Sequence, residues 1–409
     1  MSTIDEKLTT AVQNAYDHAP AVRQRFDDAG LTPADIQSVA DLPKLPVLPK
    51  DRLIELQQAD PPFGGMLAVP ITAVRHIFMS PGPIYEPDGG ENSWASATLA
   101  FQRAGFTAED IVINALSYHL VPAGLALDNA LTALGTTVVP TGIGNTDLQI
   151  KICVDLGVTG YVGTPSFLMK LVTRAQEMGF KIGEQFKINK ALTSAEPLPP
   201  SLRHTLVNEY GINILNAYAT AELGVLAVND DGGMAMDLMP EPIIEIVSPE
   251  TGEPVGPGEA GEVVVTNFSH VYPLIRLGTG DMALNIDPAP GQSQQTDRKL
   301  TLVGRSGEAL KVRGMFVHPN QLRFAAAQVA GMMGLDAPQV QGIVTRPEQR
   351  DVLTVRVAGV PADKHDVLRE PLGQAFQQAC RVRADEIVFV DGISASERGM
   401  VDQRDLFAA

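Results

Sequence analysis

Residues 136–178 read TTVVPTGIGNTDLQIKICVDLGVTGYVGTPSFLMKLVTRAQEM, and this stretch decides the fold class. Residues 136–139 and 158–162 are short, β-branched runs that favour strands. Each is followed by a longer segment in which apolar residues recur at helical spacing. Thr164 is placed to cap the second helix, which Pro165 opens. Repetition of strand and helix predicts a mostly parallel sheet with helices on its faces.

The same alternation extends on both sides, from about residue 74 to residue 300. Because ligands of such sheets bind beyond the carboxyl ends of the strands, the turns after two of these strands are the first places to look for a site. These turns are SAEP at residues 194–197 and AYATAELG at residues 217–224. The remaining predicted strands cover residues 111–114, 191–193 and 212–215, and the predicted helices cover residues 125–134, 147–156 and 165–178.

The two ends of the chain do not show this alternation of strand and helix. Residues 1–73 predict a helical lead-in with a proline-rich connector, and from residue 243 turn residues separate short strands. Residues 305–409 predict a small α+β unit. We therefore predict an α/β protein. A large N-terminal α/β domain, residues 1–304, has mostly parallel sheets and a β-rich subdomain, and residues 305–409 form a small mobile C-terminal α+β domain.

Composition narrows the possible partners. The chain of 409 residues has 44% hydrophobic and 19% charged residues, a net charge of -17 and a pI of about 4.8. This acidic balance argues against nucleic acid or an anionic membrane as the main partner. The only two cysteines, Cys153 and Cys380, form no CxxC motif and no disulfide framework, which fits a reducing cytoplasm. We find no apolar signal core at the N-terminus and expect no membrane span.

Several motifs, in the right order, resemble the adenylate-forming superfamily and, within it, the phenylacetate-coenzyme A ligases. The resemblance runs almost end to end, so it is more specific than any single motif. Its motifs are TGIGNTDLQIKICVDLG at 141–157, SAEP at 194–197, NAYATAELG at 216–224, LIRLGTGD at 274–281 and LVGRSGEALKVRG at 302–314.

The resemblance implies a nucleotide site. Tyr218 would pack against adenine, Asn216 would read its amino group, and Asp281 would bind the ribose hydroxyls. Glu222 would hold Mg²⁺, and Arg305 would contact the nucleotide. The turn formed by Ser194, Ala195 and Glu196 would line the acyl-adenylate pocket.

The resemblance also implies an acid pocket and the substrates. SYHLVPAG, residues 117–124, stands where relatives bound an aryl group, so Tyr118, Ala123 and Gly124 would line a pocket for a small carboxylic acid. The expected cofactors are ATP, Mg²⁺ and coenzyme A. The expected catalytic residues are Glu222, Arg305 and Arg398. The N-terminal helices could pair two chains in a homodimer.

One segment departs from the family in a way that bears on function. SPGPIYEP, residues 80–87, aligns with the phosphate-binding loop and keeps Ser80 and Gly82, which we count among the nucleotide-binding candidates. A phosphate loop presents backbone N–H groups, hydroxyls and a cation. Here prolines remove N–H donors, and Glu86 stands where relatives have lysine.

A second departure lies near the C-terminus. In SERGM, residues 396–400, Gly399 occupies the position of the family's adenylation lysine, and Arg398 precedes it. Arg398 or Lys311 could partly replace that lysine, with a slow first step because arginine lacks the compact charge of lysine. Two hypotheses remain open: a ligase that forms the adenylate and transfers the acyl group to coenzyme A, or a degenerate ligase that binds AMP, acyl-adenylate or acyl-coenzyme A without efficient adenylation.

Overall fold

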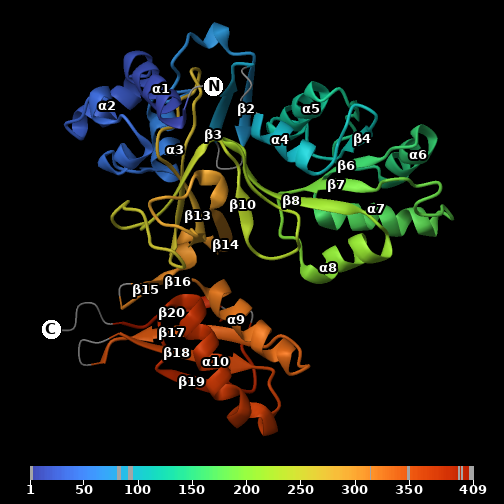
Figure 1. Ribbon diagram of the computed structural model, residues 1–409, viewed down its shortest axis with the longest axis vertical. Coiled ribbons are helices and arrows are strands. Elements are labelled where there is room, and N and C mark those ends of the chain that lie inside the picture. Colours follow the sequence, from blue (N-terminus) through green and yellow to red (C-terminus); the bar gives the residue numbers. More distant parts are fainter. Residues whose placement is uncertain are drawn as a thin grey trace. The chain divides into compact units, whose positions relative to one another are not determined.

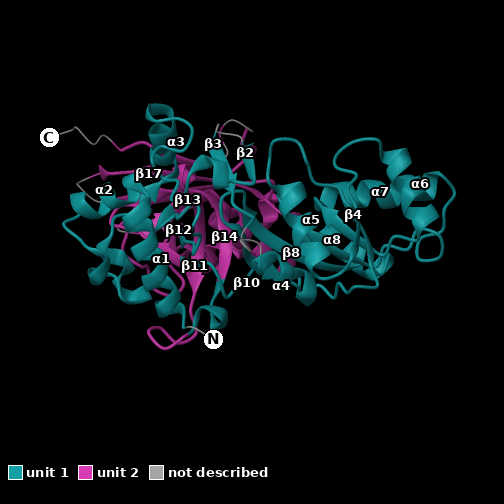
Figure 2. Ribbon diagram, turned by 90° about the horizontal axis from the view of Figure 1, so that it is seen from above, with its two compact units in different colours: residues 1–244, 265–277, 294–299 teal, residues 245–264, 278–293, 300–409 magenta. Residues whose placement is uncertain are grey.

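The computed structural model describes residues 3–80, 84–90, 95–313, 315–347, 351–394, 397 and 399–404 (Figure 1). The chain divides into two compact units, coloured separately in Figure 2. Unit 1 comprises residues 1–244, 265–277 and 294–299, and unit 2 comprises residues 245–264, 278–293 and 300–409. A boundary near residue 305 remains a prediction.

Unit 1 begins with helices α1 (Ile4–His18), α2 (Pro20–Asp28) and α3 (Lys50–Ala59). The predicted helical lead-in is interrupted at Ala19, whose backbone is extended because Pro20 starts a new helix. Further along the lead-in, the Thr32 N–H donates to Asp35 Oδ2 at 2.8 Å at the start of a short 3-10 turn, Pro33–Asp35.

The predicted parallel sheet is confirmed in unit 1. Its strands lie in the order β10-β9-β8-β7-β6-β4-β5. Neighbours from β5 to β8 are parallel, whereas β9 and β10 are added antiparallel. The strands are β4 (Ile111–Asn114), β5 (Thr137–Val139), β6 (Gly160–Gly163), β7 (Lys190–Thr193), β8 (Asn213–Thr220), β9 (Gly224–Asn229) and β10 (Met236–Leu238).

Helices cover both faces of this sheet, as its buried strands require. Val112 packs in a cluster with residues of α4 (Ala95–Arg103) and α5 (Ala123–Ala133), whereas the next residue, Ile113, packs with residues of α6 (Thr146–Leu156) and α7 (Pro165–Glu177). Successive strand residues point to opposite faces, which explains the split. The cap of α7 is confirmed, because Thr164 Oγ1 accepts from the Phe167 N–H at 3.4 Å. A short helix, α8 (Pro200–His204), follows β7.

Two segments predicted as loops or turns contain strand. The SPGPIYEP segment enters an antiparallel hairpin of β2 (His76–Ser80) and β3 (Ile84–Asp88), in which Phe78 pairs with Glu86. β8 continues to Thr220, so the turn that follows it is shorter than predicted. Pairing with β2 and with β9 supplies the hydrogen bonds that override the turn residues in both segments.

A second set of strands lies in the order β11-β12-β13-β14, and most of its residues belong to unit 2. These strands confirm the predicted β-rich subdomain. They are followed by the short pair β15 and β16 and by a sheet in the order β19-β18-β17-β20, which packs with α9 and α10 around a common apolar core. The bounds are β11 (Ile243–Val247), β12 (Ala260–Thr266), β13 (Leu277–Ile286), β14 (Lys299–Arg305), β15 (Leu310–Val312), β16 (Met315–Val317), α9 (Pro319–Met332), β17 (Gln339–Thr345), β18 (Val352–Ala358), α10 (His365–Cys380), β19 (Glu386–Val390) and β20 (Gly399–Asp402).

Within the described ranges, no helix combines the length and the apolar character that crossing a bilayer would require.

Candidate active site

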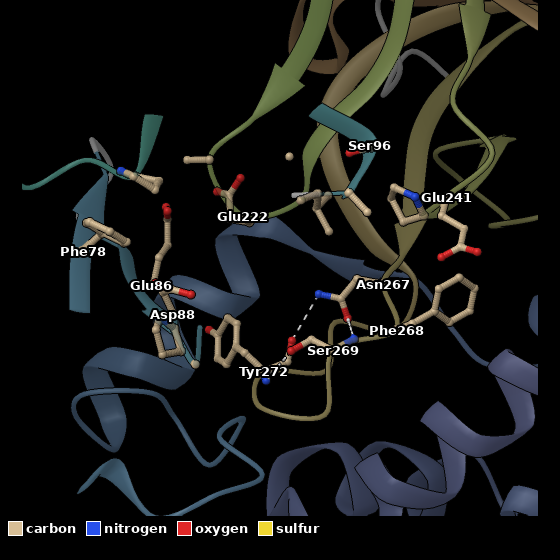
Figure 3. Close-up of a pocket in the computed structure, with 18 residues that line it drawn as sticks. Phe78, Glu86, Asp88, Ser96, Glu222, Glu241, Asn267, Phe268, Ser269 and Tyr272 are labelled. Carbon is tan, nitrogen blue, oxygen red and sulfur yellow. Dashed lines mark hydrogen bonds between the residues drawn. The ribbon is translucent and has the colours of Figure 1, made fainter. Parts of the chain in front are cut away.

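A cavity of about 230 Å³ lies within unit 1, beside β3 and the turn that follows β8 (Figure 3). Strand β8 runs parallel to its neighbour β7 in the central sheet, so this turn follows the carboxyl end of a parallel strand. Ligand sites of α/β sheets are found at such ends. The residues that line the cavity include Phe78, Glu86, Asp88, Glu222, Glu241 and Tyr272.

Glu86 is buried in this cavity wall. It lies two residues after Ile84 on β3, and both side chains point to the buried face of the strand. Glu86 is only 5% exposed, and neither carboxylate oxygen has a hydrogen-bond partner among the described residues. Burial, and then the neighbouring Glu222 carboxylate, raise the pKa of Glu86 to about 7. Ser80 and the positive charge of Lys50 act in the opposite direction and lower the pKa of Glu86. The Ser80 Oγ is buried near Glu86 but makes no hydrogen bond of regular geometry to it.

Glu222 faces the same cavity from the turn after β8. Its side chain is 2% exposed, and Lys50 Nζ lies 2.5 Å from its Oε1. Lys50 is the first residue of α3 and is 28% exposed at its side chain. The helical lead-in therefore supplies a cation to Glu222, and sequence reasoning missed this role of Lys50.

Gln57 of α3 fixes β3 beside the cavity. Its amide nitrogen donates to the Tyr85 carbonyl and to the Tyr272 hydroxyl, both at 2.9 Å, and its Oε1 accepts from the Tyr85 N–H at 2.7 Å. Burial, together with Glu86 and Glu222, raises the pKa of Tyr272. These bonds hold the strand that carries Glu86 in place.

The structure brings three predicted nucleotide-binding residues together at the end of the sheet. β7 and β8 are parallel neighbours, with Thr193 opposite Asn216, and Thr193 Oγ1 donates to Asn216 Oδ1 at 3.2 Å. Ser194 Oγ donates to the Ala217 carbonyl at 2.9 Å. Tyr218, 8% exposed, lies two residues beyond Asn216 on the same strand.

Two other residues of the SAEP turn, Ala195 and Glu196, shape the backbone around it. Ala195 has a φ of 70°, a left-handed conformation that turns the chain sharply. Glu196 Oε1 accepts from the Ser166 N–H at 2.7 Å, so this carboxylate satisfies a free N–H group at the start of α7. The sequence motif gave no sign of this second role for Glu196.

Tyr118, predicted to line the acid pocket, is held against α5. Its hydroxyl donates to Asp128 Oδ2 at 2.8 Å, and burial and Asp128 raise its pKa. The backbone of Gly124, next to Ala123 at the start of α5, donates to the Ser117 carbonyl at 2.9 Å. A Cβ on Gly124 would lie 2.4 Å from that carbonyl oxygen and 2.8 Å from a ring carbon of Tyr118.

We therefore expect Gly124→Ala to displace residues 117–118 and to lower the free energy of unfolding by about 1–3 kcal/mol, the usual cost of overpacking. Chemical denaturation of this variant, with Gly331→Ala as the control, tests this. Gly331 lies in α9 with no atom within 4 Å of an added Cβ. An unchanged stability for Gly124→Ala would contradict the close packing.

Two further predicted residues meet in unit 2. Arg305 donates to Asp281 Oδ1 at 2.6 Å, with the arginine side chain 59% and the aspartate side chain 20% exposed. Glu262 Oε1 accepts from the Gly280 N–H at 2.9 Å, and burial and Asp281 raise its pKa. The predicted ribose ligand and the predicted nucleotide-contacting arginine are thus neighbours.

Three positions, Arg398, Lys311 and Gly399, concern the adenylation lysine. Arg398 lies outside the described residues, as does Gly82 of the SPGPIYEP segment. Lys311 pairs with Glu250 and lies 5.7 Å from the centre of the Phe316 ring. Gly399 has a φ of 135°, which L residues rarely adopt, although no atom lies within 4 Å of an added Cβ. Backbone conformation therefore disfavours a lysine at position 399.

The cavity suits a hard cation better than a soft one. Glu86 and Glu222 supply carboxylate oxygens, and both oxygens of Glu86 have no hydrogen-bond partner among the described residues. The described ranges contain no group of three or more histidine, cysteine or acidic side chains arranged to hold a metal. Mg²⁺ needs only one or two carboxylates, with waters or phosphate oxygens completing its shell, so these residues fit Mg²⁺.

The chain is similar to known proteins over most of its length. Residues 91–270 match the family model described as AMP-binding enzyme. A phenylacetate-coenzyme A ligase from Pseudomonas putida is 30% identical over 335 residues, 78% of this chain and 73% of the relative. One from Aromatoleum evansii is 29% identical, over 91% of this chain and 85% of the relative.

A solved structure shares the fold. The open conformation of 2-hydroxyisobutyryl-CoA ligase, in complex with 2-HIB-AMP and CoA, superimposes with a TM-score of 0.80 at 22% identity, covering 98% of this chain and 91% of that one.

Proposed function

The chain belongs to the phenylacetate-coenzyme A ligase family of AMP-binding enzymes, and we propose that it activates a small carboxylic acid as an acyl-adenylate and passes the acyl group to coenzyme A. In the first step a carboxylate oxygen attacks the α-phosphorus of ATP, and the bond to pyrophosphate breaks. In the second step the coenzyme A sulfur attacks the acyl carbonyl, its proton is lost, and AMP leaves.

The observation that carries the proposal is the buried carboxylate of Glu222, which faces the cavity from the turn after β8 and is paired with Lys50. Glu222 would hold Mg²⁺, which neutralises phosphate charge when bound. Lys50 orients this carboxylate through their ion pair. Relatives named as coenzyme A ligases support the reaction class, and the acid itself is not specified by these features.

The other residues take supporting roles. Asn216 and Tyr218 would bind adenine at the end of β8, close to the SAEP turn, which is tied to that strand through Ser194. Asp281 would bind the ribose hydroxyls, with Arg305 at its side. Tyr118, braced by Asp128, would bound the acid pocket, and an acid with a modest aromatic or apolar group suits it. Arg398 remains the proposed substitute for the adenylation lysine.

The test is to incubate the protein with Mg·ATP, coenzyme A and a panel of aromatic and aliphatic acids, and to measure AMP and thioester by liquid chromatography. We expect equal amounts of both products with at least one acid, and a loss of about 10²-fold or more in Glu222→Gln. Glu177→Gln, an exposed acid on α7, is the matched control. Absence of thioester with every acid would contradict the proposal.

A second function is favoured by Glu86 and Gly399, which replace the lysines expected at those positions. An acid at position 86 and the absence of a lysine at position 399 both act against the first step, whereas the residues proposed to bind AMP, Asn216, Tyr218 and Asp281, are present. In this alternative the protein binds AMP, acyl-adenylate or acyl-coenzyme A without efficient adenylation. Parallel calorimetric titrations with Mg·ATP and with AMP distinguish the two, because only the alternative predicts AMP binding with ATP refused.

A further inference from the structure

The cavity contains a second carboxylate that the proposed reaction leaves without a task. Glu86 is 5% exposed, and both of its oxygens lack a hydrogen-bond partner among the described residues. A buried carboxylate without a partner is strongly unfavourable. When a protein keeps such a group, a bound ion or water commonly supplies the missing interaction. Figure 3 shows the Glu86 side chain directed toward the part of the cavity that Glu222 faces.

The surroundings of Glu86 supply oxygen atoms. The buried Ser80 Oγ, from the end of β2, also has no hydrogen-bond partner among the described residues. Glu222 has one oxygen beside Lys50 Nζ. With both carboxylates ionised, the group of Glu86, Glu222 and Lys50 carries a net charge of -1, which favours the binding of a cation. Oxygen ligands without nitrogen or sulfur select hard cations such as Mg²⁺, Mn²⁺ and Ca²⁺.

We infer that Glu86 and Glu222 together bind one divalent cation in this cavity, and that they do so before any nucleotide arrives. The inference goes beyond the proposed function, which needs a cation only at Glu222 and only with ATP. The hairpin holds Glu86 in position through the bonds of Gln57 to Tyr85, so two carboxylates are already oriented for the ion. The cation bound by Glu86 would then supply the positive charge that a lysine at this position supplies to the phosphates in relatives.

The test uses Mn²⁺ alone, titrated into the full-length protein without nucleotide and followed by electron paramagnetic resonance of the free ion. We expect one site per chain. Glu86→Gln and Glu222→Gln should each weaken Mn²⁺ binding by about tenfold or more. Glu241→Gln is the matched control, because Glu241 lines the same cavity but is 43% exposed at its side chain and pairs with Lys7. That variant should keep the affinity of the wild type within about twofold.

Two results of the Mn²⁺ titrations themselves would overturn the inference. One is the absence of a Mn²⁺ site in the wild-type chain. The other is an unchanged Mn²⁺ affinity in Glu86→Gln while Glu222→Gln loses it, which would leave Glu86 without a role in the site. Thermal unfolding of each variant confirms that it is folded. Displacement of Mn²⁺ by equal concentrations of K⁺ or ammonium would likewise contradict a divalent site. Because no substrate is present, these outcomes are independent of ligase activity.

Discussion

Replacing Lys50 with methionine should lower the free energy of unfolding at pH 8 by about 3–5 kcal/mol, as expected when one partner of a buried ion pair is removed. Lys50 Nζ lies 2.5 Å from a carboxylate whose side chain is 2% exposed. Methionine keeps most of the length of the side chain but leaves the Glu222 carboxylate without a cation. Glu86 would also lose the favourable charge of Lys50, which opposes its pKa rise.

Urea denaturation, followed by circular dichroism, measures this effect, and two further variants make it specific. Lys151→Met removes a lysine from a pair whose side chains are 65% and 53% exposed, and should change stability by less than about 0.5 kcal/mol. The double variant Lys50→Met with Glu222→Gln should recover part of the loss, since position 222 then carries no buried charge without a partner. If Lys50→Met were as stable as the wild type, the pair would have no energetic role.

Glu86→Gln should have the opposite effect and stabilise the protein at high pH. Burial raises the pKa of Glu86 from 4.5 to about 7, so the folded state binds this proton more tightly than the unfolded state. Stability is therefore lost as pH rises from about 4.5 through 7, and the loss is complete above pH 7. A rise of this size corresponds to roughly 3 kcal/mol. We expect Glu86→Gln to gain about that amount at pH 8 in buffer with EDTA.

The pH dependence separates this effect from ordinary changes in packing. At pH 5 the gain should shrink to less than about 1 kcal/mol, because Glu86 is then mostly protonated in the folded protein. Unfolding curves at both pH values, with Glu241→Gln as the control, provide the measurement. A gain that is equal at pH 5 and pH 8, or a loss at both, would contradict a buried ionisable carboxylate at this position.

Much of the fold could be predicted from local signals. The strands and helices of residues 111–178 follow the expected periodicity, and the cap at Thr164 has the expected hydrogen bond. The β3 strand was missed because Pro87 and Glu86 are unusual in a buried strand. The two-residue spacing of Ile84 and Glu86 was the only local signal that their side chains lie on the same, buried face of a strand.

The chemistry of the site was predictable only in part. Glu222, Asn216, Tyr218 and Ser194 were marked by motifs, and the structure places them in or beside the end of β8. The pairing of Lys50 with Glu222 joins residues far apart in the sequence, and no local pattern predicts such a contact. The second role of Glu196, at the start of α7, likewise depends on tertiary structure.

The central claim is that this cavity supports formation of an acyl-adenylate despite Glu86. Exchange of labelled pyrophosphate into ATP, measured with Mg²⁺ and an acid but without coenzyme A, tests that half-reaction alone. We predict acid-dependent exchange in the wild-type protein, slower than a loop lysine would allow, and its loss in Glu222→Gln. Exchange that is absent with every acid, from a protein that still binds AMP, would contradict the claim and identify a chain that binds the adenylate without making it.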